Sequence, residues 1–112
     1  MPSQVPSVAV PELPAELPEQ TVLLDVREQD EWDAGHAPQA QHIPMSELAG
    51  RLGELPDDQE LLVICRSGGR SARVTAYLNA NGWEARNVDG GMQSWQAAGR
   101  GLTCAEGEPQ VI

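Results

Sequence analysis

The sequence predicts one α/β domain built on a central parallel sheet of about five strands, with helices on both faces. Three observations lead to this fold class. Short apolar runs alternate along the chain with stretches of helical character. The connections between them are short, and an alternating chain of this kind favours parallel strands joined by crossover helices. The length of 112 residues fits a single domain.

The expected strands are short and mostly apolar. Residues 8–10 lie among prolines, which confine a strand to the edge of a sheet. Residues 21–26 and 61–65 are nearly continuous in apolar side chains, which is typical of strands buried on both faces. A brief strand over residues 41–43 ends at Pro44. The fifth expected strand covers residues 85–88.

The expected helices lie between these strands. Residues 28–34 are acid-rich and end at Gly35, so their carboxylates lie near the positive start of a helix. Ser46 is expected to cap the next helix, in which three leucines recur at helical spacing. Residues 70–81 and 92–98 are the last two expected helices. The three leucines are Leu48, Leu52 and Leu55.

The sequence divides into three segments. Residues 1–19 contain five prolines, which favour a loose leader with at most an edge strand. Residues 20–101 hold the alternating pattern and form the expected domain. Residues 102–112 have no periodicity and are expected to form an irregular C-terminal tail.

Composition and charge exclude several classes of function. The net charge of −10 argues against a nucleic-acid binder, which needs a basic face for phosphates. No apolar run approaches the length of a membrane span, and the first residues do not resemble a secretory signal. We therefore expect no membrane association, a cytoplasmic location and two reduced cysteines. The stretch between Glu60 and Glu84 has no acid but contains three arginines, and this positive island is suited to holding an anion.

The most informative segment is the end of the 61–65 strand together with the loop after it. Cys65 ends this strand, and ligands in open α/β sheets bind beyond the carboxyl ends of strands. Gly68 and Gly69 allow the backbone to turn its N–H groups inward as an anion-binding nest. The next helix adds its free N-terminal donors. This environment favours the thiolate of Cys65, because helix starts and nearby cations lower a cysteine pKa.

Several short motifs occur in a fixed order along the chain. Around Cys65 the loop reads Cys65-Arg66-Ser67-Gly68-Gly69-Arg70-Ser71. With the other motifs, this loop resembles the single-domain rhodanese-like sulfurtransferases over about residues 20–100. The other motifs are Asp25-Val26-Arg27, Glu31-Trp32, Gly35-His36, His42-Ile43-Pro44, Gly82-Trp83, Gly90-Gly91 and Trp95.

The resemblance implies a parallel sheet of about five strands and a sulfur-transfer reaction. In that reaction the catalytic Cys65 takes a sulfur atom from thiosulfate or a persulfide and carries it as a persulfide to cyanide, a thiol or a protein cysteine. The substrate-binding residues would be Arg66, Ser67, Gly68, Gly69, Arg70 and Ser71. The partners implied are a small anionic sulfur donor and a protein sulfur acceptor or thiol reductant. The family pattern usually continues Gly-His-Ile-x-Gly-Ala, whereas this chain has Ala37 and Pro38 after His36, which alters a turn near the site.

Two other functions are possible on this fold. Related phosphatases and arsenate reductases have five residues between cysteine and arginine, whereas four separate Cys65 from Arg70. The shorter loop encloses a smaller space, which suits one added sulfur atom better than a tetrahedral oxyanion. A non-catalytic rhodanese-like binding module commonly lacks the cysteine or the loop glycines, and both are present here.

The remaining polar residues near the predicted site are expected to be structural. Asp25 and Arg27 lie close to a strand end, and Arg27 is expected to pair with an acid such as Glu31. His36 and His42 have no third ligand near them in sequence, so we expect them to orient loops and expect neither a metal nor an organic cofactor. Cys104, in the tail, is expected to be an incidental thiol, with formation of a disulfide to Cys65 as the alternative.

Overall fold

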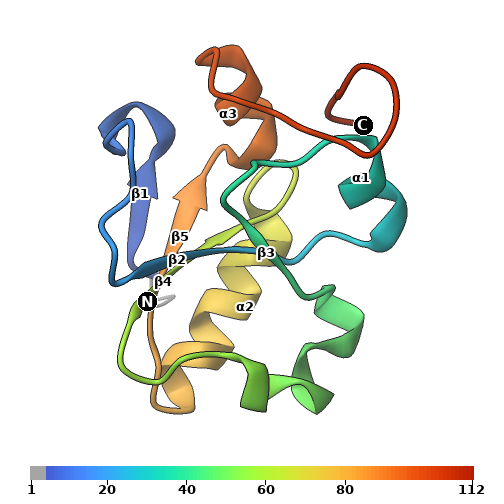
Figure 1. Ribbon diagram of the computed structural model, residues 1–112. Coiled ribbons are helices and arrows are strands. Elements are labelled where there is room, and N and C mark those ends of the chain that lie inside the picture. Colours follow the sequence, from blue (N-terminus) through green and yellow to red (C-terminus); the bar gives the residue numbers. More distant parts are fainter. Residues whose placement is uncertain (1–4) are drawn as a thin grey trace.

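The computed structural model describes residues 5–112, so the first four residues of the predicted leader lie outside the described residues. Five strands form one sheet in the order β1-β5-β4-β2-β3, and every neighbouring pair is parallel (Figure 1). The predicted fold class is therefore confirmed. The strands are β1 Ser7–Ala9, β2 Thr21–Asp25, β3 Gln41–His42, β4 Glu60–Ile64 and β5 Glu84–Asp89.

Three α-helices follow strands, as the alternation predicts. They are α1 Gln29–Ala34, α2 Gly69–Ala80 and α3 Gly91–Ala97. Three short 3-10 segments complete the regular structure of residues 5–112: η1 Val10–Glu12, η2 Met45–Gly50 and η3 Leu52–Glu54.

The helix expected after Ser46 is a wrong prediction, since η2 and η3 occupy this segment instead. Gly50 and Gly53 lower the helix propensity at its centre, so only short 3-10 turns form. Ser46 does not cap a helix, because its hydroxyl donates to Glu28 Oε1 at 2.9 Å. The leucine spacing still indicates correctly which side is buried, since Leu48 and Leu55 lie in the core.

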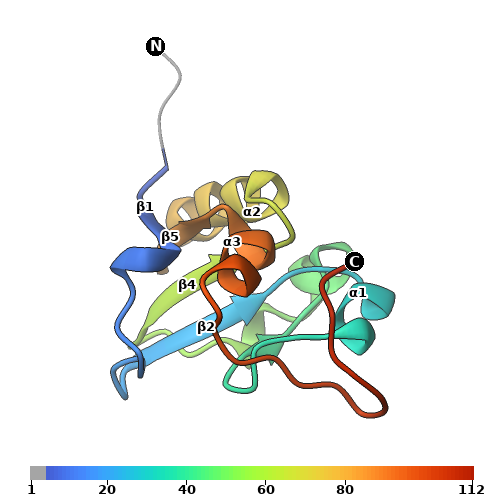
Figure 2. The same cartoon turned by 90° about the horizontal axis from the view of Figure 1, so that it is seen from above.

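The two faces of the sheet carry separate hydrophobic clusters. Successive strand residues point to opposite faces. Leu61 and Val63 of β4 pack with the buried side of α2, whereas Leu62 and Ile64 pack with Met92 and Trp95 of α3. Helices α2 and α3 therefore cover opposite faces, as seen from above in Figure 2.

The leader packs on the α3 side of the sheet. Strand β1 pairs with β5 along the outer edge of the sheet. Beyond it, Val10 and Leu13 are buried in the same cluster as α3. The Arg100 guanidinium, just past α3, donates to the carbonyls of Val10, Leu13 and Pro14. These contacts make the described part of the leader a component of the core.

The tail, residues 102–112, runs back along the domain to α1. His36 and Thr103 exchange two backbone hydrogen bonds of 2.9 and 2.8 Å, and the Gln110 amide donates to the Ala34 carbonyl at 2.9 Å. A Cβ at Gly35 would lie 2.5 Å from the Gln110 carbonyl oxygen. The close approach of the tail therefore requires a glycine at the end of α1. Both views place the C-terminal end of the tail beside α1 (Figures 1 and 2).

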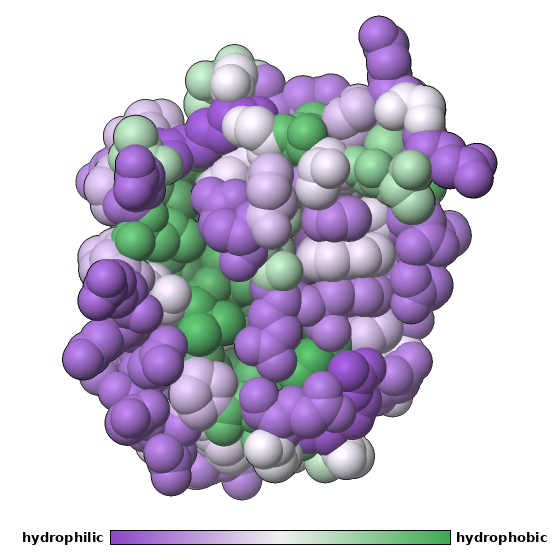
Figure 3. All heavy atoms as spheres, viewed as in Figure 1, coloured by the Kyte–Doolittle hydropathy of each residue, from purple (hydrophilic) through white to green (hydrophobic). Residues whose placement is uncertain are grey.

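Most of the molecular face in Figure 3 is hydrophilic, and its apolar side chains gather in a band rather than spreading evenly. Within residues 5–112, no helix is both long enough and apolar enough to span a bilayer. Carboxylates outnumber basic groups by 17 to 7 over the whole sequence. A ligand or partner that carries negative charge is therefore attracted only to local groups of arginines.

Candidate active site

Cys65 lies directly after β4, at the carboxyl edge of the sheet. Its side chain is buried, with 1% exposed. The strand brings the cysteine between β2 and β5, which flank β4 on its two sides. A strand of the scaffold holds a reacting side chain more precisely than a loop does.

The loop after Cys65 turns around the cysteine sulfur. Gly68 has φ of 111°, a left-handed conformation that favours glycine, and it is the N-cap of α2. Its amide donates to Cys65 Sγ at 3.1 Å, and the amides of Ser67 and Ser71 also point to the sulfur. The Ser71 hydroxyl lies 3.3 Å from the same atom. The predicted inward-facing donors are therefore present around Cys65.

These contacts set the protonation of the thiol. Burial raises the pKa of Cys65, but hydrogen bonds from the Ser71 hydroxyl and from the amides of Ser71, Gly68 and Ser67 more than offset burial. The net effect holds the pKa of Cys65 below its ordinary value of 9.0. The geometry therefore favours an anionic sulfur at this position.

Asn87 of β5 is a site residue that the sequence analysis missed. Its Oδ1 lies 2.5 Å from the Ser71 hydroxyl, whose single proton is shared between this oxygen and Cys65 Sγ. Its Nδ2 donates to the Gly68 carbonyl at 3.3 Å and to Asp89 Oδ1 at 3.2 Å. Asn87 thus connects the neighbouring strand to the loop around Cys65. The available signal was a polar side chain near the carboxyl end of a strand expected to lie beside the strand of Cys65.

The start of α3 supports the site from its other side. The Met92 amide donates to the Cys65 carbonyl at 2.7 Å, and the Gln93 amide donates to the Arg66 carbonyl at 3.0 Å. Gly91 makes this approach possible, because a Cβ there would lie 2.4 Å from the Cys65 carbonyl oxygen. The Gly90-Gly91 pair therefore belongs to the site architecture.

The three arginines of the positive island differ in their contacts. Arg70 is half-buried, and its two terminal nitrogens each donate to Glu31 at 2.7 Å. This pairing holds the pKa of Glu31 below its ordinary value of 4.5. Arg66 is exposed, and its Nε donates to the Ile112 carbonyl oxygen at 3.0 Å. Arg73 is exposed as well.

Arg27 pairs with an acid as expected, but its partner is Asp25 and not Glu31. Arg27 and Asp25 are both fully buried and form an ion pair of 2.7 Å. Arg27 also donates to the Gly35 carbonyl at 2.8 Å. A fully buried guanidinium needs an equally buried carboxylate, which Asp25 provides, whereas Glu31 reaches Arg70 on α2.

The rings of His36 and His42 both stack on Trp32, with ring centroids 3.5 and 4.5 Å from it. His36 Nδ1 donates to the Trp32 carbonyl at 2.8 Å, and His42 Nε2 donates to the Arg27 carbonyl at 2.7 Å. These contacts attach α1 to β3 and to the loop after β2. Across residues 5–112, no three side chains of His, Cys, Asp or Glu gather in a way that could hold a metal ion.

Comparison with known proteins identifies this arrangement of strand, cysteine, glycine turn and helix. Residues 10–98 match the profile of the Rhodanese-like domain family. The chain belongs to this family. The family membership that the motifs predict is therefore confirmed. The match begins at residue 10, inside the predicted leader.

Individual rhodanese-like proteins are similar over most of their length. The putative sulfurtransferase YtwF of Bacillus subtilis is 43% identical over 81 residues, which cover 72% of this chain and 79% of the relative. A sulfurtransferase of Allochromatium vinosum is 34% identical over 90 residues, covering 80% and 84% of the two chains. The crystal structure of a rhodanese-related protein from Thermoplasma volcanium superposes with a TM-score of 0.82 at 33% identity, covering 89% of this chain and 99% of that one.

Both cysteines are free, Cys65 in the rhodanese-like domain and Cys104 in the tail. Cys104 is half-buried, and its thiol donates to the carbonyl oxygens of Glu106 and Gly107 within the tail. These contacts hold Cys104 inside a turn of its own segment. Cys65 is therefore the thiol whose surroundings are arranged to stabilise negative charge.

Proposed function

We propose that this protein is a sulfurtransferase in which Cys65 takes a sulfane sulfur from thiosulfate or a persulfide and passes it to a thiophilic acceptor. The relatives named sulfurtransferases support sulfur transfer at the level of the family. The observation that carries the proposal is the set of donors around Cys65 Sγ: the amides of Ser67, Gly68 and Ser71 and the Ser71 hydroxyl. Such donors stabilise an anionic sulfur before and after transfer.

In the first step the Cys65 thiolate attacks the outer sulfur of the donor. A new S–S bond forms to Cys65, and the S–S bond of thiosulfate breaks with its electron pair leaving on sulfite. The product is Cys65–S–S⁻, with the negative charge on the added sulfur. Because the thiol is buried, the donor approaches from the solvent-facing side of the loop, where Arg66, Ser67 and Gly69 are exposed. We call this side the mouth of the loop.

In the second step the acceptor attacks the added sulfur. Cyanide leaves as thiocyanate, or a thiolate becomes a persulfide, and the electron pair of the broken S–S bond returns to Cys65. The inward amides stabilise the returning thiolate as they did the starting one, so no proton is needed at the cysteine in either step. We propose that Arg66, exposed at the mouth, guides an anionic donor, which its exposure and positive charge support.

Two features favour sulfur over a phosphate-like oxyanion. The loop between Cys65 and Arg70 has four residues, so its ring of amides encloses little space. Arg70 uses both terminal nitrogens on Glu31, so the fork that would grip a tetrahedral oxyanion is already occupied. Arg70 is therefore proposed to hold the loop to α1.

Incubation with thiosulfate followed by intact-mass measurement tests the proposal directly. We expect the protein to gain one sulfur atom, which cyanide then removes as thiocyanate. The gain should be absent in Cys65→Ser and retained in Cys104→Ser, since Cys104 is bonded within its own turn.

Two results would replace this proposal with another. Hydrolysis of an aryl phosphate without sulfur uptake would assign the site to phosphoryl chemistry. Absence of both activities across thiosulfate and persulfide donors would identify the domain as a non-catalytic binding module.

A further inference from the structure

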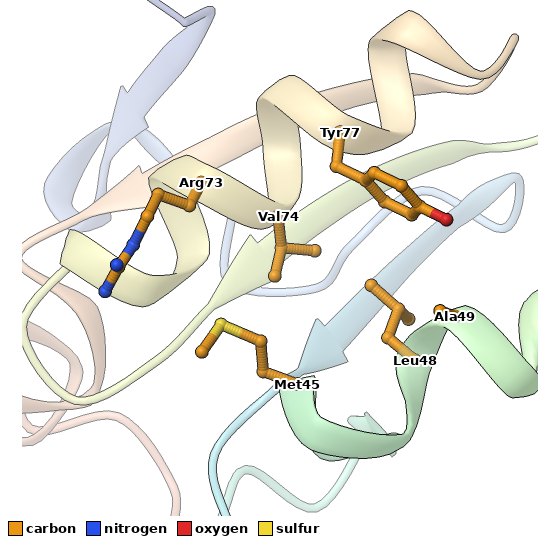
Figure 4. A pocket seen from close by; sticks show the side chains of 6 residues that line it. All are labelled: Met45, Leu48, Ala49, Arg73, Val74 and Tyr77. Atoms are coloured by element: carbon orange, nitrogen blue, oxygen red, sulfur yellow. The ribbon is translucent and has the colours of Figure 1, made fainter.

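An apolar groove lies beside the candidate active site, between α2 and η2 (Figure 4). Its walls are the side chains of Val74 and Tyr77 on α2 and of Met45 and Leu48 on η2. Tyr77 is 40% exposed, which makes it one of the few large apolar side chains on the surface. The groove has a volume of about 230 Å³.

The groove runs away from the reacting sulfur along α2. Ser71, whose hydroxyl contacts Cys65 Sγ, lies one turn before Val74 on this helix. With a rise of about 1.5 Å per residue, Val74 and Tyr77 lie roughly 4.5 and 9 Å further along the axis. An extended peptide advances about 3.3 Å per residue, so a side chain two or three positions from a reacting cysteine reaches the groove.

The size of the groove indicates what it accepts. Sites for whole small molecules are commonly about 300–1,000 Å³, so this groove is small for a cofactor or drug-sized ligand. A volume of about 230 Å³ with apolar walls fits one inserted side chain. Anchor side chains of this kind are the usual centres of protein–protein contacts.

The charge at the groove indicates the character of its occupant. Arg73 lies at the end nearest the loop after Cys65, and no carboxylate of the described chain lines the groove (Figure 4). The structure records no ion pair for Arg73 among residues 5–112. Glu47 of η2, the acid in the segment opposite, forms its ion pair with Arg51. Because the rest of the chain is strongly acidic, this end of the groove is where negative charge is attracted.

We propose that the groove binds a protein sulfur acceptor whose reactive cysteine has an acidic neighbour and a large apolar side chain two or three residues away. The apolar side chain enters between Met45 and Tyr77, and the carboxylate meets Arg73. This inference rests on the proposed sulfur transfer and names the class of acceptor for it. The acceptor thiolate attacks the outer sulfur of Cys65–S–S⁻, which forms the acceptor persulfide and returns the electron pair to Cys65.

Three synthetic peptides test the proposal with protein that thiosulfate has already loaded. The first has a cysteine with an aspartate on each side and a leucine three residues away on each side, so it tests both chain directions. The second replaces the leucines with alanine, and the third replaces the aspartates with asparagine. The readout is the single-turnover rate at which each peptide gains one sulfur atom.

On the wild-type protein we expect the leucine peptide to accept sulfur about tenfold faster than its alanine version, as burial of a leucine side chain predicts. We expect the aspartate peptide to exceed the asparagine peptide about threefold, with the ratio shrinking at high salt. Tyr77→Ala should reduce the first ratio, and Arg73→Ala should reduce the second. Both side chains are exposed, so these variants keep the fold.

The matched control is Arg86→Ala, which removes an arginine that pairs with Glu60 and does not line the groove; both ratios should stay at their wild-type values. Equal transfer to all three peptides after normal sulfur loading overturns the groove proposal alone. Faster transfer to propanethiol than to the leucine peptide, again dependent on Tyr77, would assign the groove to a small thiol and also overturn it. Absence of sulfur loading on the wild-type protein overturns both the proposed function and this inference.

Discussion

The two helices that begin at the carboxyl ends of β4 and β5 start in the same way and do different things. Each has a glycine N-cap in the left-handed conformation, Gly68 with φ of 111° and Gly90 with φ of 81°. At the start of α2 the free amides face the sulfur of Cys65. At the start of α3 the amides of Met92 and Gln93 are bonded to backbone carbonyl oxygens.

The starts of α2 and α3 are alike in conformation and differ in the atoms that accept their hydrogen bonds. The N-terminal donors of a helix need partners wherever the helix is. Where these donors bind backbone carbonyl oxygens, as at α3, they form a structural joint between two segments. Where they face a thiol, as at α2, they stabilise negative charge on its sulfur. The joint made by α3 holds the carbonyls of Cys65 and Arg66, and so it fixes the loop that α2 uses.

The largest expected effect comes from breaking the joint at α3. Gly91→Ala places a Cβ 2.4 Å from the Cys65 carbonyl oxygen at a residue with φ of 56°. We expect it to lower the free energy of unfolding by about 3–4 kcal/mol, measured by chemical denaturation. Gly99→Ala is the matched control, since Gly99 has φ of 75° with nothing near its Cβ, and should cost about 1 kcal/mol. Equal costs for the two variants would mean that the close contact is unimportant.

A smaller effect is expected from removing one donor at the start of α2. Ser71→Ala deletes the hydroxyl beside Cys65 Sγ and leaves Asn87 Oδ1 without its partner. We expect a loss of about 1–3 kcal/mol in stability and an iodoacetamide alkylation rate of Cys65 at neutral pH lower by a factor on the order of ten. Ser94→Ala, in the first turns of α3, should leave the alkylation rate unchanged. An unchanged rate in Ser71→Ala would show that the amides alone stabilise the thiolate.

The pH dependence of alkylation sharpens the comparison further. In a Cys104→Ser background only Cys65 reacts, and its thiolate is the nucleophile. Since burial is more than offset by hydrogen bonds to the sulfur, the pKa of Cys65 is below 9.0, and the alkylation rate should rise with pH to a midpoint below that value. The same ionisation stabilises the fold above the unfolded pKa, and this contribution is lost as the pH falls through the folded pKa. A midpoint at or above 9.0 would contradict the arrangement around the sulfur.

The smallest expected effect is at the clamp between α1 and α2. Glu31→Gln weakens the two hydrogen bonds to Arg70 and should cost about 1 kcal/mol, because the pair is partly exposed. The pKa of Glu31 is held below 4.5 by Arg70, so the contribution is complete above pH 4.5 and is lost as the pH falls through the folded pKa. Denaturation at several pH values should therefore show wild type and variant converging in acid. A constant difference at all pH values would contradict a charge-dependent clamp.

Features encoded by neighbouring residues were predictable from the sequence. The strand that ends at Cys65, the glycine turn and the helix after it occupy one continuous segment, and the observed geometry matches the prediction. The failure after Ser46 is also local in origin. The leucine spacing there predicts an α-helix, but Gly50 and Gly53 in the same segment lower helix propensity and favour short 3-10 turns.

Pairings between distant residues were not predictable in the same way. The sequence offered Glu31 as a partner for Arg27, yet Glu31 binds Arg70, which lies 39 positions further along the chain. Asn87 and Gly91 reach the site only because β5 lies beside β4 and α3 packs on the opposite face from α2. Neither residue is adjacent in sequence to Cys65.

The amino-acid order by itself determined the elements, the parallel sheet and the position of the cysteine in a glycine turn, because periodicity, turn chemistry and helix starts act over a few residues. Folding in three dimensions decided which carboxylate neutralises which guanidinium and which amide meets which carbonyl oxygen. It also decided that the groove opens beside the sulfur. These outcomes depend on burial and on the meeting of separate segments, and a buried charge or donor takes whichever partner the packing brings within reach.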